Sequence, residues 1–190
     1  MNRLSFFKVS LLFVFLIFSF GFFIVRLLVT SPDFYLILNE DFSISSDIVN
    51  FFNYDSLDSS KYLEIEIVHM NDVLDLLDFW FMVFIVCFVL FLLVLYFCSY
   101  RDILIGFRIS LLFFVVLFFL MIVFFDRAFY LFHRVFFSQG GWVFPYESII
   151  IQNMPFVFFL RGLIFVLVFV FLFVFFLRRL IDFKKNTTSL

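Results

Sequence analysis

The chain has 190 residues, 66% of them hydrophobic and 26% aromatic, with a mean hydropathy of +1.20. Water-soluble domains are roughly half apolar, so this composition excludes a soluble globular protein and predicts one integral membrane domain over residues 1–190. The net charge of −2 excludes little, because the charged residues are segregated along the chain.

Apolar runs long enough to cross a bilayer predict an all-α integral membrane fold with four transmembrane helices. A spanning helix needs about 20 apolar residues. The runs lie at about 6–29, 79–98, 109–125 and 157–177. The first run is too long for a cleaved secretion signal and has no small-residue cleavage site before "TSPDF", so we interpret it as an uncleaved signal anchor.

The segment between the first two spans, residues 31–78, is strongly acidic. From Asp33 to Asp78 it holds eleven acidic residues and a single basic one, Lys61. Cytoplasmic loops of membrane proteins are instead enriched in Lys and Arg. We therefore expect this segment on the extracytoplasmic side.

Basic residues mark the parts of the chain that belong inside. They lie at the N-terminus, in the short loop after the second span and in the C-terminal tail: Arg3, Lys8, Arg101, Arg108, Arg178, Arg179, Lys184 and Lys185. The positive-inside rule then predicts a multi-pass plasma membrane protein with both termini in the cytoplasm. Four spans place both irregular segments, 31–78 and 126–156, on the extracytoplasmic face.

The end of the first outer segment, "EIEIVHMNDVLDLLDF", carries one of the two histidines. Alternation of Leu63, Ile65 and Ile67 with glutamates suggests a short strand, whereas the positions from His69 onward fit a helix leading into the second span. We favour the helix, in which His69 and Asp72 are neighbours at i and i+3. Asp72 could then fix the tautomer of His69 and stabilise its charged form. A solvated acidic helix entrance with one stray histidine remains an alternative.

The second outer segment, 126–156, carries the other histidine. His133 follows Tyr130 at helical spacing, and Arg127 and Arg134 lie close to it in the sequence. Because both outer segments share one membrane face, His69 and His133 could meet above the bundle or at its outer mouth.

The rest of this segment combines a turn with interfacial aromatic residues. Gly140-Gly141 permits a tight reversal, and Trp142 suits the membrane interface, where an aromatic ring with a polar tip is favoured. The following "YESIIIQNMP" is too short to span, so it could lie along the interface or re-enter the membrane. An ordinary interfacial loop with anchoring aromatics is the alternative.

Several classes of site have no support in the sequence. There is no phosphate-binding glycine loop, no His-Glu-x-x-His motif and no nucleophile elbow. The cysteines, Cys87 and Cys98, lie in an apolar run at a spacing that fits no zinc site or disulfide framework. We expect no cofactor, no metal and no nucleic-acid partner. The nearly apolar spans also disfavour a channel or transporter.

The two histidine-bearing stretches resemble the lipoprotein intramolecular transacylase (Lit) family. The family pattern Glu-x-x-His-Met-x-Asp-Val reads here from Glu66 to Val73, before the second span. The later patterns Phe-His-x-x-Phe-Phe and Gly-x-Trp-x-Phe-Pro read here at 132–137 and 140–145, and the segment ends at Pro155. Order, spacing and topology all agree over most of the chain.

The resemblance implies acyl transfer within a lipidated protein. Lit-type enzymes move an acyl chain from the glycerol sn-2 oxygen of a diacylglyceryl cysteine to that cysteine's α-amine, which leaves a lyso-form lipoprotein. Diacylglyceryl lipoproteins and membrane lipids are then the expected partners. The substrate itself supplies nucleophile and acyl donor, so no nucleophilic serine or cysteine is required.

Such a reaction needs a base for the amine proton and an acid for the leaving oxygen, and histidine suits both near pH 7. We therefore expect His69 and His133 as the acid–base pair, with Asp72 orienting His69. We expect four further residues to stabilise the oxyanion or to position the substrate: Tyr130, Arg134, Arg127 and Trp142. A non-catalytic accessory or structural membrane protein is the alternative function.

Overall fold

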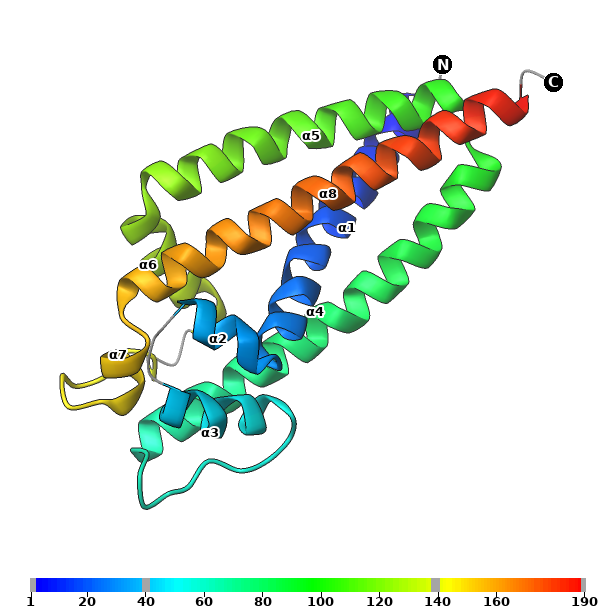
Figure 1. Cartoon of the computed structure of the whole chain (residues 1–190). Helices are drawn as coiled ribbons and strands as arrows, with labels where there is room; N and C mark the ends of the chain where they lie inside the picture. Colours follow the sequence, from blue (N-terminus) through cyan, green and yellow to red (C-terminus); the bar gives the residue numbers. More distant parts are fainter. Residues whose placement is uncertain (1–2, 39–41, 138–140, 189–190) are drawn as a thin grey trace.

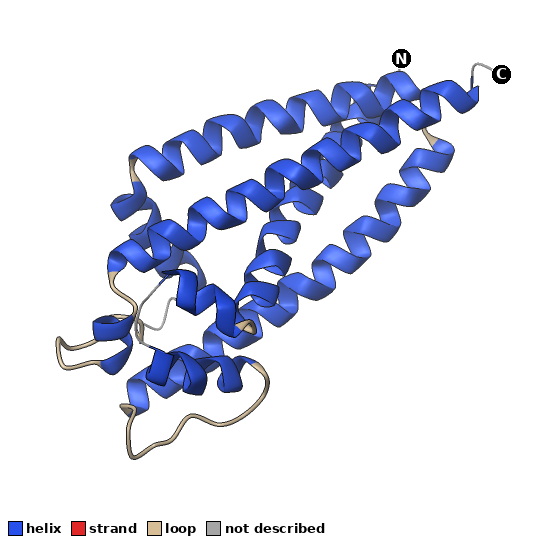
Figure 2. Cartoon of the chain, viewed as in Figure 1, coloured by secondary structure: helices blue, strands red, loops and turns tan. Residues whose placement is uncertain are grey.

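The structure is a computed structural model that describes residues 3–38, 42–137 and 141–188. All regular secondary structure in these ranges is helical, which confirms the all-α fold (Figure 2). The helices are α1 (Arg3–Val29), α2 (Pro32–Leu38), α3 (Phe42–Phe52), α4 (Glu64–Phe97), α5 (Tyr100–Val123), α6 (Phe125–Phe136), α7 (Ile149–Asn153) and α8 (Phe156–Thr188).

Four of these helices, α1, α4, α5 and α8, are long and apolar enough to cross a membrane. They overlap the spans expected at 6–29, 79–98, 109–125 and 157–177. Helix α1 packs against the other three. Both chain termini lie at one end of the bundle, whereas α2, α3, α6 and α7 gather at the other (Figure 1). We call that second end the cap end.

Helix α4 extends well beyond the length that a membrane requires. Its 34 residues would extend about 51 Å at 1.5 Å per residue, whereas the hydrocarbon core is about 30 Å thick. Its acidic residues, from Glu64 to Asp78, all precede the apolar stretch that starts at Phe79. The first turns of α4, including His69, therefore project beyond the membrane-spanning part.

The sequence before His69 is compatible with a strand or a helix, and the structure shows a helix. Helix α4 already begins at Glu64, so Ile65 and Ile67 are helical although they alternate with acidic residues. The alternation misleads because Glu66 faces the protein interior, where it is fully buried, rather than solvent. The Gly140-Gly141 turn lies partly outside the described residues, since Gly140 is not among them.

The bundle away from the cap end is held together by close packing of α1 on its neighbours. A Cβ atom on Gly106 of α5 would lie 2.7 Å from Val9 Cγ1, so only glycine permits this approach. One turn further along α5, the buried Ser110 hydroxyl donates to the Ser10 carbonyl of α1 at 2.8 Å. Small residues that bring helix backbones close together are typical of helix packing in membranes.

A cluster of buried apolar side chains forms the interior of the cap end. Buried side chains of α2, α3, α4, α7 and α8 meet there, including Tyr35, Ile48, Met70, Ile150 and Phe158. Because these helices come from both segments between the spans, the cluster joins chain regions that are distant in sequence. It forms the apolar support on which the cap end is built.

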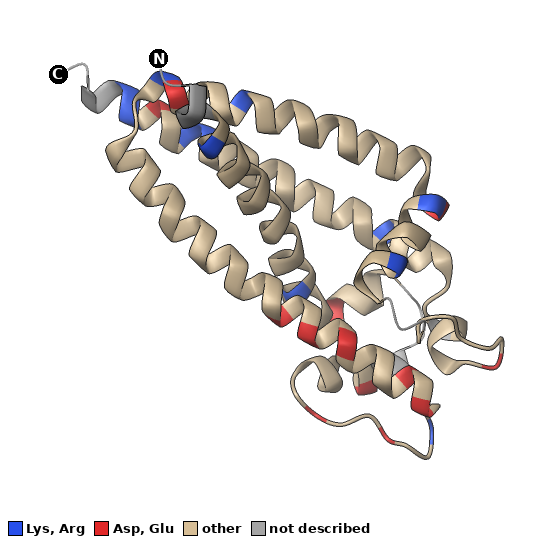
Figure 3. Ribbon diagram, turned by 180° about the vertical axis from the view of Figure 1, so that it is seen from behind, with Lys and Arg blue, Asp and Glu red and all other residues tan. Residues whose placement is uncertain are grey.

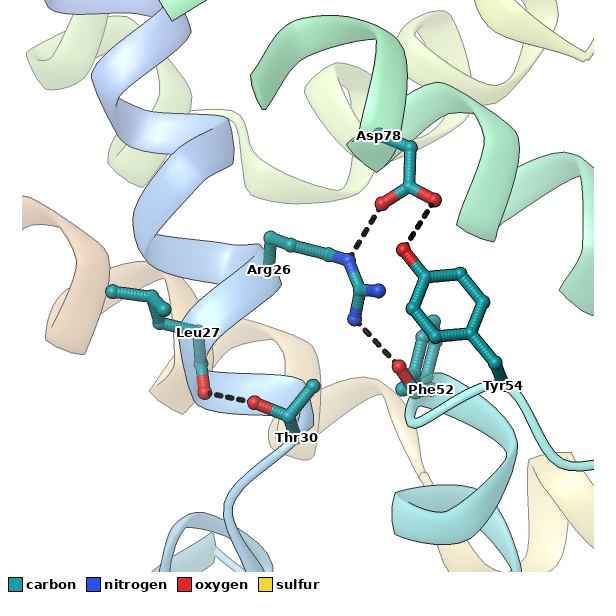
Figure 4. A network of polar contacts seen from close by, with 6 residues as sticks. All are labelled: Arg26, Leu27, Thr30, Phe52, Tyr54 and Asp78. Atoms are coloured by element: carbon teal, nitrogen blue, oxygen red, sulfur yellow. Dashed lines mark hydrogen bonds and ion pairs between the residues drawn. The ribbon is translucent and has the colours of Figure 1, made fainter. Parts of the chain in front are cut away.

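A charged contact joins α1, α4 and the loop after α3 at the cap end (Figure 4). Arg26 Nε donates to Asp78 Oδ1 at 2.7 Å, and its Nη1 donates to the carbonyl of Phe52 at 2.6 Å. The Tyr54 hydroxyl donates to the other Asp78 oxygen at 3.0 Å. The arginine near the end of the apolar α1 is therefore paired rather than isolated, as a poorly solvated charge requires.

Charge is divided between the two ends of the bundle (Figure 3). Lysines and arginines gather near the chain termini, whereas most acidic residues lie at the cap end, many of them along the start of α4. The molecule therefore presents ends of opposite charge.

Candidate functional site

The two histidines of the chain meet at the cap end. The ring centroids of His69 on α4 and His133 on α6 are 5.8 Å apart, and the ring planes are inclined by 31°. The sequence left open whether these side chains approach each other. The fold brings them together because α6, which follows α5 directly, carries His133 to the part of α4 that holds His69.

Phenylalanines on α6 determine how that helix lies. Phe132 and Phe136 contact Phe22 of α1, with ring centroids 6.2 and 6.1 Å apart. Phe129 contacts Phe159 of α8 at 5.2 Å. The apolar face of α6 therefore packs onto the bundle, while Arg127 and Arg134 stay on its exposed side.

His133 is held in one tautomer by its own helix. Its Nδ1 lies 2.8 Å from the carbonyl oxygen of Phe129. A carbonyl only accepts hydrogen bonds, so Nδ1 carries the hydrogen and Nε2 of the neutral ring keeps its lone pair. Burial lowers the pKa of His133, and the Phe129 carbonyl partly opposes this effect by favouring the charged ring. Neutral His133 therefore offers a proton acceptor at Nε2.

His69 is the more enclosed histidine. It is 7% exposed, and its buried Nδ1 has no hydrogen-bond partner among the residues that the structure describes. Burial lowers the pKa of His69 to about 4, with a smaller contribution from the positive charge that His133 can carry opposite it. Near pH 7 both rings are therefore neutral.

Aromatic rings surround the pair. Phe137 and Phe144 approach His69 edge-on, with centroids at 4.7 and 5.4 Å. Trp142 contacts His133 at 5.0 Å. These rings keep water away from the imidazoles, which is why both pKa values fall.

Three other residues expected at the site form a chain that leads away from His133. The ring of Tyr130 packs edge-on against Trp142 at 5.3 Å, and the Arg134 guanidinium lies 5.9 Å from the centre of the Tyr130 ring. Trp142 thus links His133 to a tyrosine and an arginine.

Asp72 and Arg127 stand apart from this group. Both are exposed, and within the described ranges no hydrogen bond joins Asp72 to His69. Arg127 lies near the start of α6, and no ring contact or ion pair connects it to the histidines within the same ranges.

The structure adds two residues that sequence reasoning missed, Glu66 and Ser148. Both are 0% exposed, and the Ser148 hydroxyl donates a hydrogen bond to Glu66 Oε1. Glu66 was part of the pattern that ends at Val73, but its acidic surroundings suggested a solvated position. Its place one turn before His69 was the available signal.

No metal site is evident in the part of the chain that the structure describes, where no three His, Cys, Asp or Glu side chains converge. The arrangement instead offers two neutral imidazoles, one with a defined acceptor nitrogen, in a water-poor aromatic enclosure at the end of a membrane bundle. Such a site can move protons to and from a lipid-borne reactant.

A comparison with protein families found a match over most of the chain. The family described as "Lipoprotein intramolecular transacylase Lit" matches residues 6–159, a range that contains both histidines, all of α4 and α5 and most of α1. Comparisons with curated proteins and with solved structures found no match.

Proposed function

The chain belongs to the lipoprotein intramolecular transacylase (Lit) family, and we propose that it transfers the sn-2 acyl chain of a diacylglyceryl cysteine to the α-amine of that same cysteine. The amine nitrogen forms a bond to the acyl carbonyl carbon, and the bond from that carbon to the glyceryl oxygen breaks. One proton leaves the nitrogen and one reaches the glyceryl oxygen. The product is an N-acyl, S-monoacylglyceryl lipoprotein.

The proximity of the two histidines is the observation that carries this proposal. His133 acts as the base, because Nδ1 donates to Phe129 and Nε2 can take the amine proton. The proton taken by His133 passes to His69, whose ring centroid lies 5.8 Å away, and the charged His69 then donates a proton to the leaving glyceryl oxygen. The pair thus returns to its starting charge. An acid or base of this kind typically contributes about 10²–10⁴-fold.

The remaining site residues act around this pair. Trp142, Tyr130 and Arg134 form a contiguous group beside His133, so they position the acyl ester or stabilise its oxyanion. Arg127, on the exposed side of α6, contacts the rest of the substrate. Asp72 orients His69 once its side chain turns toward the imidazole, one helical turn away.

Orientation is part of the same proposal. The basic end of the bundle, which holds both termini, faces the cytoplasm, and the cap end with the histidines faces outward from the plasma membrane. The charge separation supports this orientation. A substrate anchored by its acyl chains then reaches the site from the outer leaflet.

Mass spectrometry of lipoprotein N-termini tests the function. The gene is expressed in a bacterium that lacks its own N-acylating enzymes, beside His133→Ala and beside Tyr146→Ala as a control. Tyr146 lies in the same outer segment and is 87% exposed. We expect diacylglyceryl peptides to become lyso N-acyl peptides with the wild type and the control but not with His133→Ala.

Two results would speak against the proposal. Full conversion by a folded His133→Ala protein would remove that histidine from the chemistry. An absence of conversion by well-expressed wild type would favour the non-catalytic alternative, an accessory or structural membrane protein.

A further inference from the structure

One buried carboxylate connects the two segments that make up the cap end. Glu66, near the start of α4, accepts three hydrogen bonds and has no exposed surface. Its Oε2 accepts from the backbone N–H of Leu63 at 2.8 Å. Its Oε1 accepts from the Ser148 hydroxyl and from the backbone N–H of Ile150, the latter at 3.1 Å.

These bonds cap two helices with one side chain. The first N–H groups of any helix lack partners within the helix. Glu66 satisfies the N–H of Leu63, the residue that precedes α4, and the N–H of Ile150 in α7. Ser148 completes the second cap, because its oxygen accepts from the N–H of Ile151 at 3.2 Å. The starts of α4 and α7 are therefore joined through Glu66 and Ser148.

This joint lies next to the histidine pair. Glu66 precedes His69 by one helical turn on the same helix. On the other side of the joint, Ser148 follows the stretch that contacts the imidazoles, since Trp142 touches His133 and Phe144 touches His69. Ile150, just after Ser148, is buried in the apolar cluster of the cap end. The aromatic stretch is thus attached to α4 close to the place where it covers His69.

We propose that Glu66 and Ser148 are a positioning pair that holds residues 141–153 over the two histidines. The inference rests on the proposed function, because the aligned imidazoles matter only if they carry out the transfer. Glu66 is enclosed on all sides, so it does not touch the substrate. It acts through the segment that it holds.

A role confined to folding predicts a different behaviour. In that case, the loss of Glu66 lowers the amount of folded protein, while each folded molecule turns over at the normal rate. A positioning role lowers kcat of the folded enzyme and leaves KM nearly unchanged, since alignment is needed in the transition state more than in binding. Rates must therefore be expressed per folded molecule.

Four variants separate these possibilities. Glu66→Ala removes all three bonds, Glu66→Gln keeps the volume and one acceptor oxygen, and Ser148→Ala removes the hydroxyl alone. The control is Glu64→Ala, which removes the same charge two residues earlier, where the side chain is exposed. We expect kcat to fall about 100-fold for Glu66→Ala and about 10-fold for Ser148→Ala. Glu66→Gln should lie between wild type and Glu66→Ala, and Glu64→Ala should match wild type.

The double variant Glu66→Ala/Ser148→Ala tests whether the two residues act together. Residues that share one interaction give non-additive effects. We expect the double variant to be no slower than Glu66→Ala alone. Independent contributions would instead multiply the two losses.

A second readout does not depend on activity. The chain has two tryptophans, so replacing Trp80 by Phe leaves Trp142 as the single reporter of the held segment. We expect acrylamide to quench Trp142 more strongly in Glu66→Ala and Ser148→Ala than in wild type or Glu64→Ala. If wild type shows no transacylation but this pattern appears, the proposed function fails while the positioning of the segment stands.

Unchanged quenching together with unchanged kcat in Ser148→Ala and Glu66→Gln would overturn the positioning role. These milder variants decide the question even if Glu66→Ala does not fold. A loss of kcat that is the same in Glu64→Ala would also overturn it, because the effect would then follow the charge of the helix start rather than the joint.

Discussion

At the scale of single residues, the site depends on the low pKa values of two imidazoles. Burial and the facing His133 lower the pKa of His69 to about 4, and burial lowers that of His133. A base must be neutral to accept a proton, and both rings remain neutral below the ordinary histidine pKa of about 6.5. In the proposed reaction, the aromatic enclosure therefore extends toward acid the pH range in which the base is neutral.

The first prediction concerns the pH dependence of the rate. Because the folded pKa values are lowered, the acid limb of the kcat profile should lie below the ordinary histidine value. Phe137→Ala opens the contact beside His69 and admits water, so it should move that limb toward higher pH. The measurement is kcat against pH, with Phe183→Ala, an exposed phenylalanine of α8, as the control. If the acid limb lay at the same pH in Phe137→Ala and in wild type, burial by Phe137 would not be what lowers the pKa of His69.

The second prediction concerns stability and follows from the same shift. The unfolded chain holds His69 at its ordinary pKa, so below about pH 6.5 it binds more protons than the folded protein. The free energy of unfolding should be fully retained above that pH and should decline as the pH falls toward the folded value near 4. Measured by thermal unfolding, wild type should therefore lose stability relative to His69→Gln as the pH falls through this window. A difference in stability that stays constant between the ordinary and the folded pKa of His69 would exclude a contribution of its protonation to stability.

The third prediction tests Asp72. An exposed carboxylate one turn from His69 can orient the imidazole only by turning toward it, so its contribution should be modest. We expect Asp72→Asn to lower kcat about 10-fold, which is less than the loss of a direct acid or base would cause, without a change in unfolding temperature. The exposed Asp75, one further turn from the histidine, supplies the control as Asp75→Asn. Equal rates for both variants would leave Asp72 without a role.

At the scale of elements, the contact of α1 with α5 holds the part of the bundle farthest from the histidines. Gly106 allows a separation that no larger residue fits, and Ser110 adds a hydrogen bond to the facing backbone. Val9, which a new Cβ would strike, is branched at Cβ and has little freedom to move aside. An added atom at Gly106 would therefore have to be accommodated by a shift of the helix backbones.

The fourth prediction compares two glycines. Gly106→Ala should lower the free energy of unfolding by about 1–3 kcal/mol, as overpacking of a tight interior does. Gly21→Ala is the control, because its new Cβ would meet only ordinary contacts at 3.9 Å. The measurement is unfolding of the purified protein in detergent or lipid. Equal losses of stability in the two variants would show that the close approach of α1 and α5 does not cause the effect of Gly106→Ala.

At the scale of the whole molecule, the separation of charge between the two ends underlies the proposed orientation. The described structure shows oppositely charged ends, and the positive-inside rule converts this difference into a direction. In the proposed orientation, the histidine pair lies on the outer side of the membrane. This assignment can be tested without any substrate.

The fifth prediction uses labelling of intact cells. Both native cysteines are free thiols and are first replaced by alanine. Single cysteines are then placed at Tyr146, at the cap end, and at Phe183, near the C-terminus, which are both exposed. A membrane-impermeant maleimide should label the first position in whole cells and the second only after lysis. The reverse pattern would invert the topology.

The sequence predicted the long apolar helices and the two outer segments because these depend on composition and on charge counts. A family pattern surrounds each histidine, so the sequence also singled out both as candidate site residues, and their role stays a prediction. It could not place Glu66, because a glutamate between isoleucines gives the same pattern whether it faces water or a partner that is distant in sequence. That partner, Ser148, lies in a segment whose path depends on the packing of α6 and on the apolar cluster. Burial of polar residues is thus decided by tertiary contacts that local patterns do not contain.

The continuity of α4 has a consequence for the lipid environment. His69 and the apolar stretch that starts at Phe79 belong to one uninterrupted helix, so the imidazole stands about 15 Å, at 1.5 Å per residue, before the start of that stretch. A bilayer that is too thick or too thin makes a helix tilt or deforms the lipid around it. Either response would change the height of His69 relative to the ester plane of the surrounding lipids. The fit between bilayer thickness and this helix should therefore tune turnover, with a maximum at one lipid chain length.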